Sequence, residues 1–296
     1  MDYLKKYGYV PSEEKIALRI DAIAAGYENL ASTEAYKKCF SMMDLTTLHT
    51  NDTAESVRKL VAKTNDLRTQ YPDYPMPASI CVFPNFASVV RDSRNDPEVH
   101  VTTVSSCFPS AQSYLEVKVL ESVLAVRNGA EEVDIVLALN SFLAGDYESA
   151  SKEITAMKEA IDKEAASQNR KVVLKVILET GLLSTPENIA NASFLAMEAG
   201  ADFIKTSTGK VEVNATPMAA MVMCDCIAKY HEATGRKVGF KAAGGISTAK
   251  DALSYYAIVS SVLGSEWLDK KYFRLGVSRL GNSLMSAIEQ QTVKYF

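Results

Sequence analysis

Short apolar runs alternate with longer amphipathic stretches along most of the 296-residue chain. The runs are rich in β-branched residues and have the length of strands. They lie at 39–44, 78–83, 99–106, 131–139, 171–180, 201–207, 237–245 and 272–278. The stretches between them, such as 113–129 and 147–167, carry apolar residues at helical spacing. Gly129 and Gly200 follow such stretches, where a left-handed C-cap favours glycine. The pattern predicts eight strands that alternate with helices.

Strands that are apolar along almost their whole length are typical of a parallel sheet that helices cover on both faces. Eight strand–helix units in about 250 residues match the size of a (β/α)₈ barrel, the TIM barrel. An open, doubly wound sheet is the alternative that the pattern leaves. No change of composition marks a linker, so we expect one α/β domain, a TIM barrel, over residues 39–296.

Residues 1–38 form a predicted N-terminal helical extension. Ser12 is a candidate N-cap, and Glu13 and Glu14 suit the positive end of a helix dipole. Apolar residues then recur at helical spacing, at Ile16, Ile20, Ile23 and Tyr27. We expect one additional helix over about 12–36, packed on the outside of the barrel or across its bottom.

Composition narrows the class of protein. The net charge of −4 argues against a general nucleic-acid binder, which needs a basic surface. No apolar run has the length of a membrane span, and the N-terminus lacks the apolar segment of a secretory signal. Five cysteines, four of them in apolar stretches, favour reduced thiols and a cytoplasmic location. Three scattered histidines predict no metal site, and we expect no cofactor.

Charged residues interrupt the predicted strands where a barrel places its chemistry, toward the carboxyl ends. Asp44 ends the first run, Asp134 lies within the fourth and Lys175 within the fifth. Lys205 and Lys241 end the sixth and seventh runs. Taken alone, a lysine at a strand end more often reaches solvent or pairs with a carboxylate. Several together at one end of a barrel favour a functional cluster.

The charges of this predicted cluster do not balance. Three lysines that face two aspartates leave positive charge unmatched, and an excess of positive charge lowers a lysine pKa. A lysine that is uncharged near neutral pH is a nucleophile for carbonyl carbons. The pattern therefore predicts that one lysine forms a Schiff base while its neighbour keeps it unprotonated.

Small residues in three consecutive loops predict a phosphate site. Such loops expose backbone N–H groups near helix N-termini, and barrels commonly bind phosphate beside the seventh and eighth strands. The alternative is that the glycines only form tight turns. The sequence STGK at 207–210 does not complete a P-loop motif, so we expect no nucleotide site there. The candidates are Gly209, Lys210, Gly244, Gly245, Gly276 and Ser278.

Six segments, taken in order, resemble deoxyribose-phosphate aldolase over about 250 residues. They are MDLTTL (43–48), EEVDIVL (131–137), LKVILETG (174–181), GADFIKTSTGK (200–210), VNAT (213–216) and GFKAAGG (239–245). The resemblance implies a class I aldolase on a TIM barrel. Such enzymes reversibly cleave 2-deoxy-D-ribose 5-phosphate to D-glyceraldehyde 3-phosphate and acetaldehyde without a metal.

The resemblance also implies a role for each matching position. Lys205 is the implied Schiff-base lysine and Lys241 the second lysine that perturbs it. Asp134 is implied to transfer protons with a water molecule, and Lys175 and Asp44 to complete the polar network.

Some positions depart from the family pattern. Ala242 stands where the family usually has proline. Ser247, which the resemblance places among the phosphate-binding residues, stands where the family often has arginine. Arg279 follows Ser278 near the last strand, and we hypothesise that it restores the positive charge lost at Ser247 in the phosphate site. Family members can end in a mobile tyrosine that assists proton transfer. Tyr295 is the candidate here, although a tail aromatic is more often packed or disordered.

Two alternatives to this function remain open. One is another Schiff-base barrel that acts on phosphosugars, such as a transaldolase-like or ketose-phosphate aldolase. The other is a non-catalytic barrel that binds a phosphometabolite. The partners implied are phosphosugar and aldehyde substrates, with neither nucleic acid nor membrane, and a homodimer is expected for this family.

Overall fold

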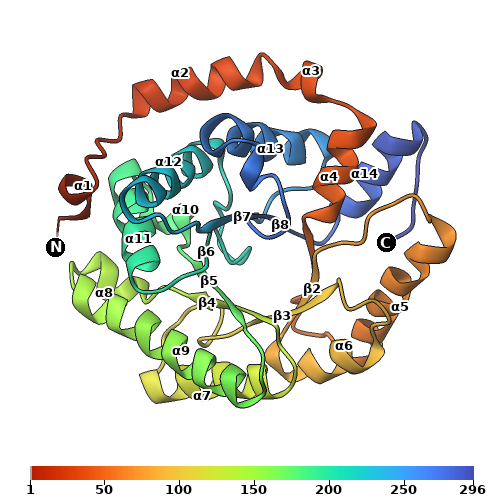
Figure 1. Cartoon of the computed structure of the whole chain (residues 1–296), viewed down its shortest axis with the longest axis horizontal. Helices are drawn as coiled ribbons and strands as arrows, with labels where there is room; N and C mark the ends of the chain where they lie inside the picture. The colour runs from red at the N-terminus through yellow and green to blue at the C-terminus, as the bar shows by residue number, and fades with distance from the viewer. Residues whose placement is uncertain (1) are drawn as a thin grey trace.

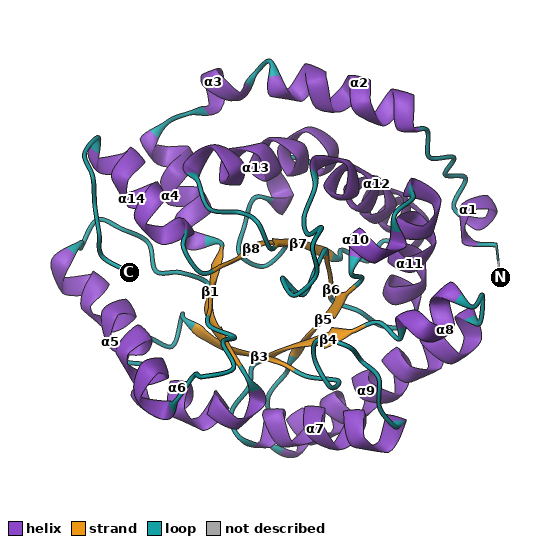
Figure 2. Cartoon of the chain, turned by 180° about the vertical axis from the view of Figure 1, so that it is seen from behind, coloured by secondary structure: helices purple, strands orange, loops and turns teal. Residues whose placement is uncertain are grey.

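Eight parallel strands close into a barrel at the centre of the molecule (Figures 1 and 2). This computed structural model describes residues 2–296. The strands follow one another around the barrel in chain order, and β8 pairs with β1 to close it. Their bounds are β1 Met43–Thr46, β2 Ser79–Val82, β3 His100–Val104, β4 Glu132–Val136, β5 Val173–Ile177, β6 Phe203–Lys205, β7 Gly239–Ala243 and β8 Phe273–Val277. The TIM-barrel prediction is confirmed, and the closure excludes an open sheet.

Helices surround the barrel and pack their apolar sides on the strands (Figure 2). The first four are α1 Tyr3–Lys6, α2 Glu13–Ala24, α3 Tyr27–Leu30 and α4 Thr33–Ser41. The others are α5 Ala54–Gln70, η1 Pro84–Phe86, α6 Ala87–Ser93, α7 Leu115–Arg127, α8 Leu139–Leu143, α9 Tyr147–Ser167, α10 Thr180–Leu183, α11 Pro186–Glu198, α12 Pro217–Thr234, α13 Ala249–Leu263, η2 Ser265–Trp267 and α14 Leu280–Glu289. Within residues 2–296 no helix combines the length and apolar character that crossing a bilayer requires.

The first predicted strand was placed too early. Residues 39–41 end helix α4, and β1 begins only at Met43. Ser32 caps α4 by accepting the N–H of Ala35, and Phe40 is fully buried against Tyr74 and Phe296. A short apolar run does not by itself distinguish a buried helical turn from a strand. As a result, Asp44 lies inside β1 and does not end it.

The N-terminal extension contains several helices where the sequence predicted one. Ser12 caps α2 as expected, but α2 ends at Ala24. The segment α1–α3 runs along the outer side of α11, α12 and α13 (Figure 1). Tyr7 stacks on Phe194 with 4.3 Å between ring centroids, and Arg19 forms two hydrogen bonds with Asp225. The extension is thus an outer layer on three barrel helices. The boundary at residue 38 stays a prediction, and α4 runs across it.

Candidate active site

Seven charged side chains meet inside the barrel, and they are called the charged cluster below. They come from six of the eight strands, and each is at least 97 % buried. Side chains alternate between the two faces of a strand, so residues two apart, such as Glu132 and Asp134, share the inner face. Buried charges are costly unless they are paired, which explains why both signs are present. The members are Asp44, Glu132, Asp134, Lys175, Lys205, Lys241 and Arg274.

Asp134 is the centre of the cluster. One carboxylate oxygen accepts a hydrogen bond from Lys175 at 2.9 Å. The other accepts from both Lys205 and Lys241, each at 2.8 Å. The structure therefore brings together the two lysines and the aspartate that the sequence proposed as the reacting group. Lys205 ends β6 as expected, whereas Lys241 lies in the middle of β7.

Glu132 and Arg274 belong to the cluster although the sequence prediction omitted them. Glu132 lies 2.5 Å from Lys175 and 2.6 Å from Arg274. Arg274 also contacts Asp44 at 2.5 Å, and Lys241 contacts the other oxygen of Asp44 at 2.5 Å. The signal was present in the sequence. Glu132 precedes Asp134 by two residues, and Arg274 interrupts an apolar run as Lys175 does.

The lysines of the cluster differ in pKa. Burial lowers the pKa of Lys205 below its ordinary value; Asp134 raises it in part, and the positive charge of Lys241 lowers it again. Burial also lowers the pKa of Lys241, but Asp134 and Asp44 outweigh it, so the net shift is upward. The pKa of Lys175 is raised in the same way, because Asp134, Glu132 and Asp44 outweigh the effect of burial. Lys205 is consequently the lysine of the cluster that gives up its proton most readily.

The charge balance of the cluster agrees with this assignment. Among the described residues it holds four cations, three lysines and one arginine, against three carboxylates. One positive charge is in excess when every group is ionised. Burial raises the pKa of Asp134, but Lys175, Lys205 and Lys241 outweigh it and hold the pKa far below its ordinary value. Asp134 is therefore a carboxylate, and loss of one proton from Lys205 makes the cluster neutral.

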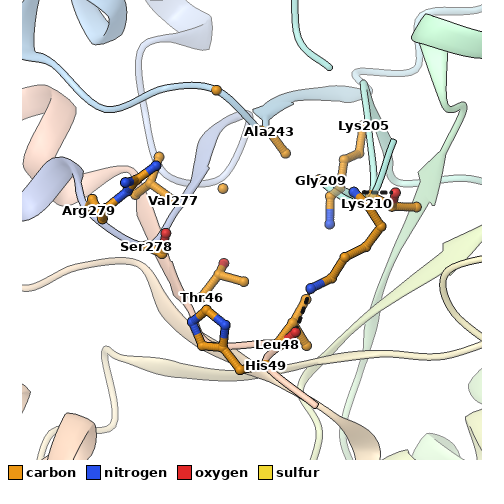
Figure 3. A pocket seen from close by; sticks show the side chains of 14 residues that line it. Thr46, Leu48, His49, Lys205, Gly209, Lys210, Ala243, Val277, Ser278 and Arg279 are labelled. Atoms are coloured by element: carbon orange, nitrogen blue, oxygen red, sulfur yellow. Dashed lines mark hydrogen bonds between the residues drawn. The ribbon is translucent and has the colours of Figure 1, made fainter. Parts of the chain in front are cut away.

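A pocket of about 240 Å³, which Lys205 lines, lies at the carboxyl ends of the strands (Figure 3). Its walls are the loops that follow β1, β6, β7 and β8. Seven of the eight predicted phosphate-site residues line it: Gly209, Lys210, Gly244, Gly245, Gly276, Ser278 and Arg279. The sequence prediction missed the end of β1 and the loop after it, which contribute Thr46, Leu48 and His49, and also missed Thr208, Ala243 and Val277.

Two of the glycines are required by close contacts. A Cβ on Gly276 would lie 2.9 Å from Cε of Lys241, so glycine leaves space for that side chain. A Cβ on Gly244 would lie 2.6 Å from the side chain of Asn214, and its φ of +83° is also unfavourable for other residues. These glycines do more than form turns: Gly276, inside β8, leaves room for Lys241 of the cluster, and Gly244, just after β7, lets the β7 loop approach Asn214 in the loop after β6.

Cationic side chains stand on opposite sides of the pocket (Figure 3). Lys210 reaches across to the loop after β1, where its Nζ donates to the carbonyl of Leu48 at 2.6 Å. Arg279 and Ser278 lie on the other side, at the N-terminus of α14. Positive charge and a helix N-terminus both favour an anion between these walls.

The structure does not bring Ser247 or Tyr295 to the pocket lining. Ser247 is exposed, and its N–H donates to Asp251 at 3.0 Å at the start of α13. Tyr295 packs on α5: its hydroxyl donates to the carbonyl of Lys63 at 2.5 Å, and its ring lies edge-on to Tyr71. Their roles as a phosphate contact and a proton donor have no support from this arrangement.

A closed parallel barrel with a lysine of lowered pKa in a pocket that cationic side chains line is typical of barrel enzymes that attack carbonyls through an amine. The model of the DeoC/LacD family of aldolases matches residues 39–262, and the chain belongs to this family. It is therefore an aldolase by family, and the resemblance seen in the sequence is confirmed at this level.

Relatives support the same assignment. The chain is 40% identical over 269 residues to a Caenorhabditis elegans protein named "Putative deoxyribose-phosphate aldolase", covering 90% of this chain and 86% of the relative. The structure of the aldolase QR15 is 28% identical with a TM-score of 0.62, covering 85% and 95%. The deoxyribose phosphate aldolase from Aeropyrum pernix is 24% identical with a TM-score of 0.65, covering 93% and 98%. This last similarity shows the fold alone.

Proposed function

We propose that the chain reversibly cleaves 2-deoxy-D-ribose 5-phosphate to D-glyceraldehyde 3-phosphate and acetaldehyde through a Schiff base on Lys205. The observation that carries the proposal is the position of Lys205: it lines the pocket, and its Nζ lies 2.8 Å from the carboxylate of Asp134. Burial and the neighbouring Lys241 lower its pKa. The family and the relative at 40% identity support the substrate.

The first step is attack of Lys205 Nζ on the aldehyde carbon, C1, of the open-chain sugar. Loss of water then gives an iminium, which accepts the electrons of the C2–C3 bond when that bond breaks. The C3 hydroxyl must lose its proton as the bond breaks, and C2 of the resulting enamine must gain one. Water completes the cycle by hydrolysing the iminium to release acetaldehyde.

Asp134 is the group placed to move these protons. Its carboxylate is ionised and lies 2.8 Å from Lys205 Nζ, so it can accept a proton directly or through a water molecule and later return it. Lys241 has a raised pKa and stays charged, so its positive charge lowers the pKa of Lys205 and stabilises negative charge that develops nearby during the reaction. Lys175 holds the carboxylate of Asp134 in place, and Asp44 holds the ammonium group of Lys241.

The decisive experiment is trapping of the Schiff base. Borohydride reduction in the presence of acetaldehyde, followed by peptide mass mapping, is expected to give an ethyl adduct on Lys205. Lys271, an exposed lysine just before β8, is the internal control and is expected to stay unmodified. No adduct, or one on a different lysine, contradicts the mechanism.

The same experiment separates the alternatives. Another Schiff-base phosphosugar aldolase would trap its own carbonyl substrate on Lys205 but not use acetaldehyde as donor. A non-catalytic phosphometabolite-binding barrel would give no adduct while still binding phosphate. The ionised carboxylate of Asp134, 2.8 Å from Lys205 Nζ, favours the catalytic proposals.

Arg279 is proposed as the phosphate contact that compensates for Ser247. Arg279 lines the pocket and Ser247 does not, which supports the exchange of charge between the two positions. Arg279→Ala is expected to raise KM for the phosphorylated sugar about tenfold, since a charged hydrogen bond contributes about 1.5–3 kcal/mol. Lys271→Ala is the matched control at the other end of β8. A rise of no more than twofold contradicts this role.

We propose a homodimer, and the outward face of α7 is the surface it would use, because Val117, Leu120 and Leu124 are exposed there. A solution mass near 32.3 kDa by light scattering would contradict a dimer.

Five free cysteines support the cytoplasm as the proposed location of the protein.

A further inference from the structure

The turn Thr208–Lys210 after β6 forms one wall of the pocket. Gly209 adopts a φ of +79°, and a Cβ there would meet no atom within 4 Å, so the backbone conformation and not the available space calls for glycine. The side chain of Thr208 is buried, and its Oγ1 accepts the N–H of Lys210 at 3.1 Å. The shape of the turn thus depends on how this hydroxyl is held.

Glu179 holds Thr208 from behind. One carboxylate oxygen accepts the N–H of Thr208 at 3.1 Å, and the other accepts its hydroxyl at 2.5 Å. Because the hydroxyl proton is committed to Glu179, a lone pair of Oγ1 is available to the N–H of Lys210. Hydrogen bonds linked in this way strengthen one another in a buried site. Glu179 is 2 % exposed and does not line the pocket.

The backbone of Glu179 is in an unfavourable conformation that the surrounding structure maintains. Its φ of 56° and ψ of 59° are left-handed, a conformation that residues other than glycine rarely adopt and that clusters at functional sites. The flanking residues are fixed to the end of β6: Leu178 N–H donates to the carbonyl of Lys205, and Thr180 N–H to that of Thr206, both at 2.9 Å. Glu179 is therefore anchored to the strand that carries the candidate nucleophile.

The same short segment also contacts the far end of the β6 loop. A Cβ on Gly181 would lie 2.0 Å from the carbonyl oxygen of Val213, so only glycine permits this approach. Glu179 holds the beginning of the loop and Gly181 lies against its later part. Residues 179–181 therefore contact the β6 loop at two points. Neither Glu179 nor Gly181 lines the pocket.

We propose that Glu179 is a positioning residue: through Thr208 it keeps the Thr208–Lys210 turn in the shape that receives the phosphate of the substrate. The inference deepens the proposed function and rests on it for the identity of the substrate. A carboxylate near a phosphate is electrostatically unfavourable, so its presence here is explained by its two hydrogen bonds to Thr208. The effect is expected on phosphate recognition and not on the chemistry at Lys205.

The test compares two sugars that differ only in the phosphate. The quantity measured is the ratio of kcat/KM for 2-deoxy-D-ribose 5-phosphate to kcat/KM for 2-deoxy-D-ribose, called the phosphate preference. Glu179→Ala is expected to lower this preference tenfold or more. Glu187→Ala, at an exposed glutamate in the first turn of α11, is the control and keeps the preference of the wild type.

A second variant covers the case in which Glu179→Ala does not fold. Thr208→Val replaces the hydroxyl with a methyl group of similar volume and is expected to lower the preference as much, while Thr208→Ser restores it. The double variant with Glu179→Ala and Thr208→Val is expected to have a phosphate preference no lower than that of the more affected single variant, because both residues act through the same chain of hydrogen bonds. The inference is overturned if the phosphate preference of folded Thr208→Val falls by less than fivefold. It is also overturned if kcat/KM falls by the same factor for both sugars.

Failure of the proposed function gives a different result. If the wild type cleaves neither sugar and forms no adduct at Lys205, the proposed function is wrong, and calorimetry with inorganic phosphate takes the place of kinetics. A Kd at least fivefold weaker in Thr208→Val than in Thr208→Ser then still supports the role of Glu179. Equal Kd values in these two variants overturn it.

Discussion

The charged cluster has a closed end, called the floor below, where Lys175 and Lys241 lie, and an open end at the pocket, where Lys205 lies. The pKa of a lysine shifts in opposite directions at these two ends. Lys205 and Lys241 face each other across the β6–β7 register, and both are buried. On the floor, Lys241 contacts two carboxylates and Lys175 contacts three, and their pKa values rise. At the open end, Lys205 contacts Asp134 alone and its pKa falls.

The difference shows that burial alone does not decide the charge of a lysine. Desolvation opposes the charged form of all three lysines and is the largest influence on each. The number of carboxylates within reach then decides the sign of the net shift. The barrel uses two lysines as permanent cations and a third as a candidate nucleophile, with one shared aspartate between them.

Removal of the lysine at the open end is expected to have the largest effect. Lys205→Leu is expected to lower kcat by at least about 10⁴-fold, the scale seen when a covalent nucleophile is lost. The protein is expected to stay folded, because Asp134 keeps Lys175 and Lys241 as partners. Retro-aldol assays with circular dichroism measure both. Lys271→Leu is the control, and a residual rate within 100-fold of the wild type would show that Lys205 is not the nucleophile.

Removal of a floor lysine is expected to act through the pKa of Lys205. Without the cation of Lys241, protonation of Lys205 costs less, and Asp134 pairs more closely with it, so its pKa rises. Each unit of rise leaves about tenfold less free amine at neutral pH. Lys241→Leu is therefore expected to slow adduct formation about 10–100-fold at pH 7 and to move its pH profile toward alkaline values. Borohydride trapping across a pH series measures this, and an acid shift would contradict it.

Acid is expected to weaken the floor of the cluster with a smaller effect. Burial raises the pKa of Asp44, but Lys241, Arg274 and Lys175 outweigh it and lower the pKa to about 2. An unfolded aspartate has a pKa of about 3.9. Because the folded value is the lower one, the stabilisation is present above about pH 4 and is lost as the pH falls toward 2, by about 2–3 kcal/mol.

Urea unfolding at a series of pH values measures this loss. Asp44→Asn provides the comparison, because a side chain that does not titrate is expected to flatten the dependence on pH in this window. Glu132 and Asp134 also have lowered pKa values, so some dependence remains in that variant. A free energy of unfolding that is constant between pH 4 and pH 2.5 in the wild type would contradict the ion pairing of the floor.

Much of the site was predictable because strand ends, glycines and charges are visible as local patterns. Lys205, Lys241 and Asp134 were expected together, and they meet within hydrogen-bonding distance. Glu132 and Arg274 were missed, although the spacing of two and the interrupted run pointed to them. Ser247 and Tyr295 were proposed by analogy with the family, and the structure places both outside the pocket lining.

The sequence by itself determined the alternation of strands and helices, the barrel and the identity of five of the seven charged residues on the inner faces. These follow from periodicity and from the cost of burying a charge without a partner. Tertiary structure alone decided which lysine has the lowered pKa, because that depends on carboxylates brought from strands far apart in the chain. It also decided that Glu179 supports the turn at Thr208, since a hydrogen bond across 29 residues has no local pattern.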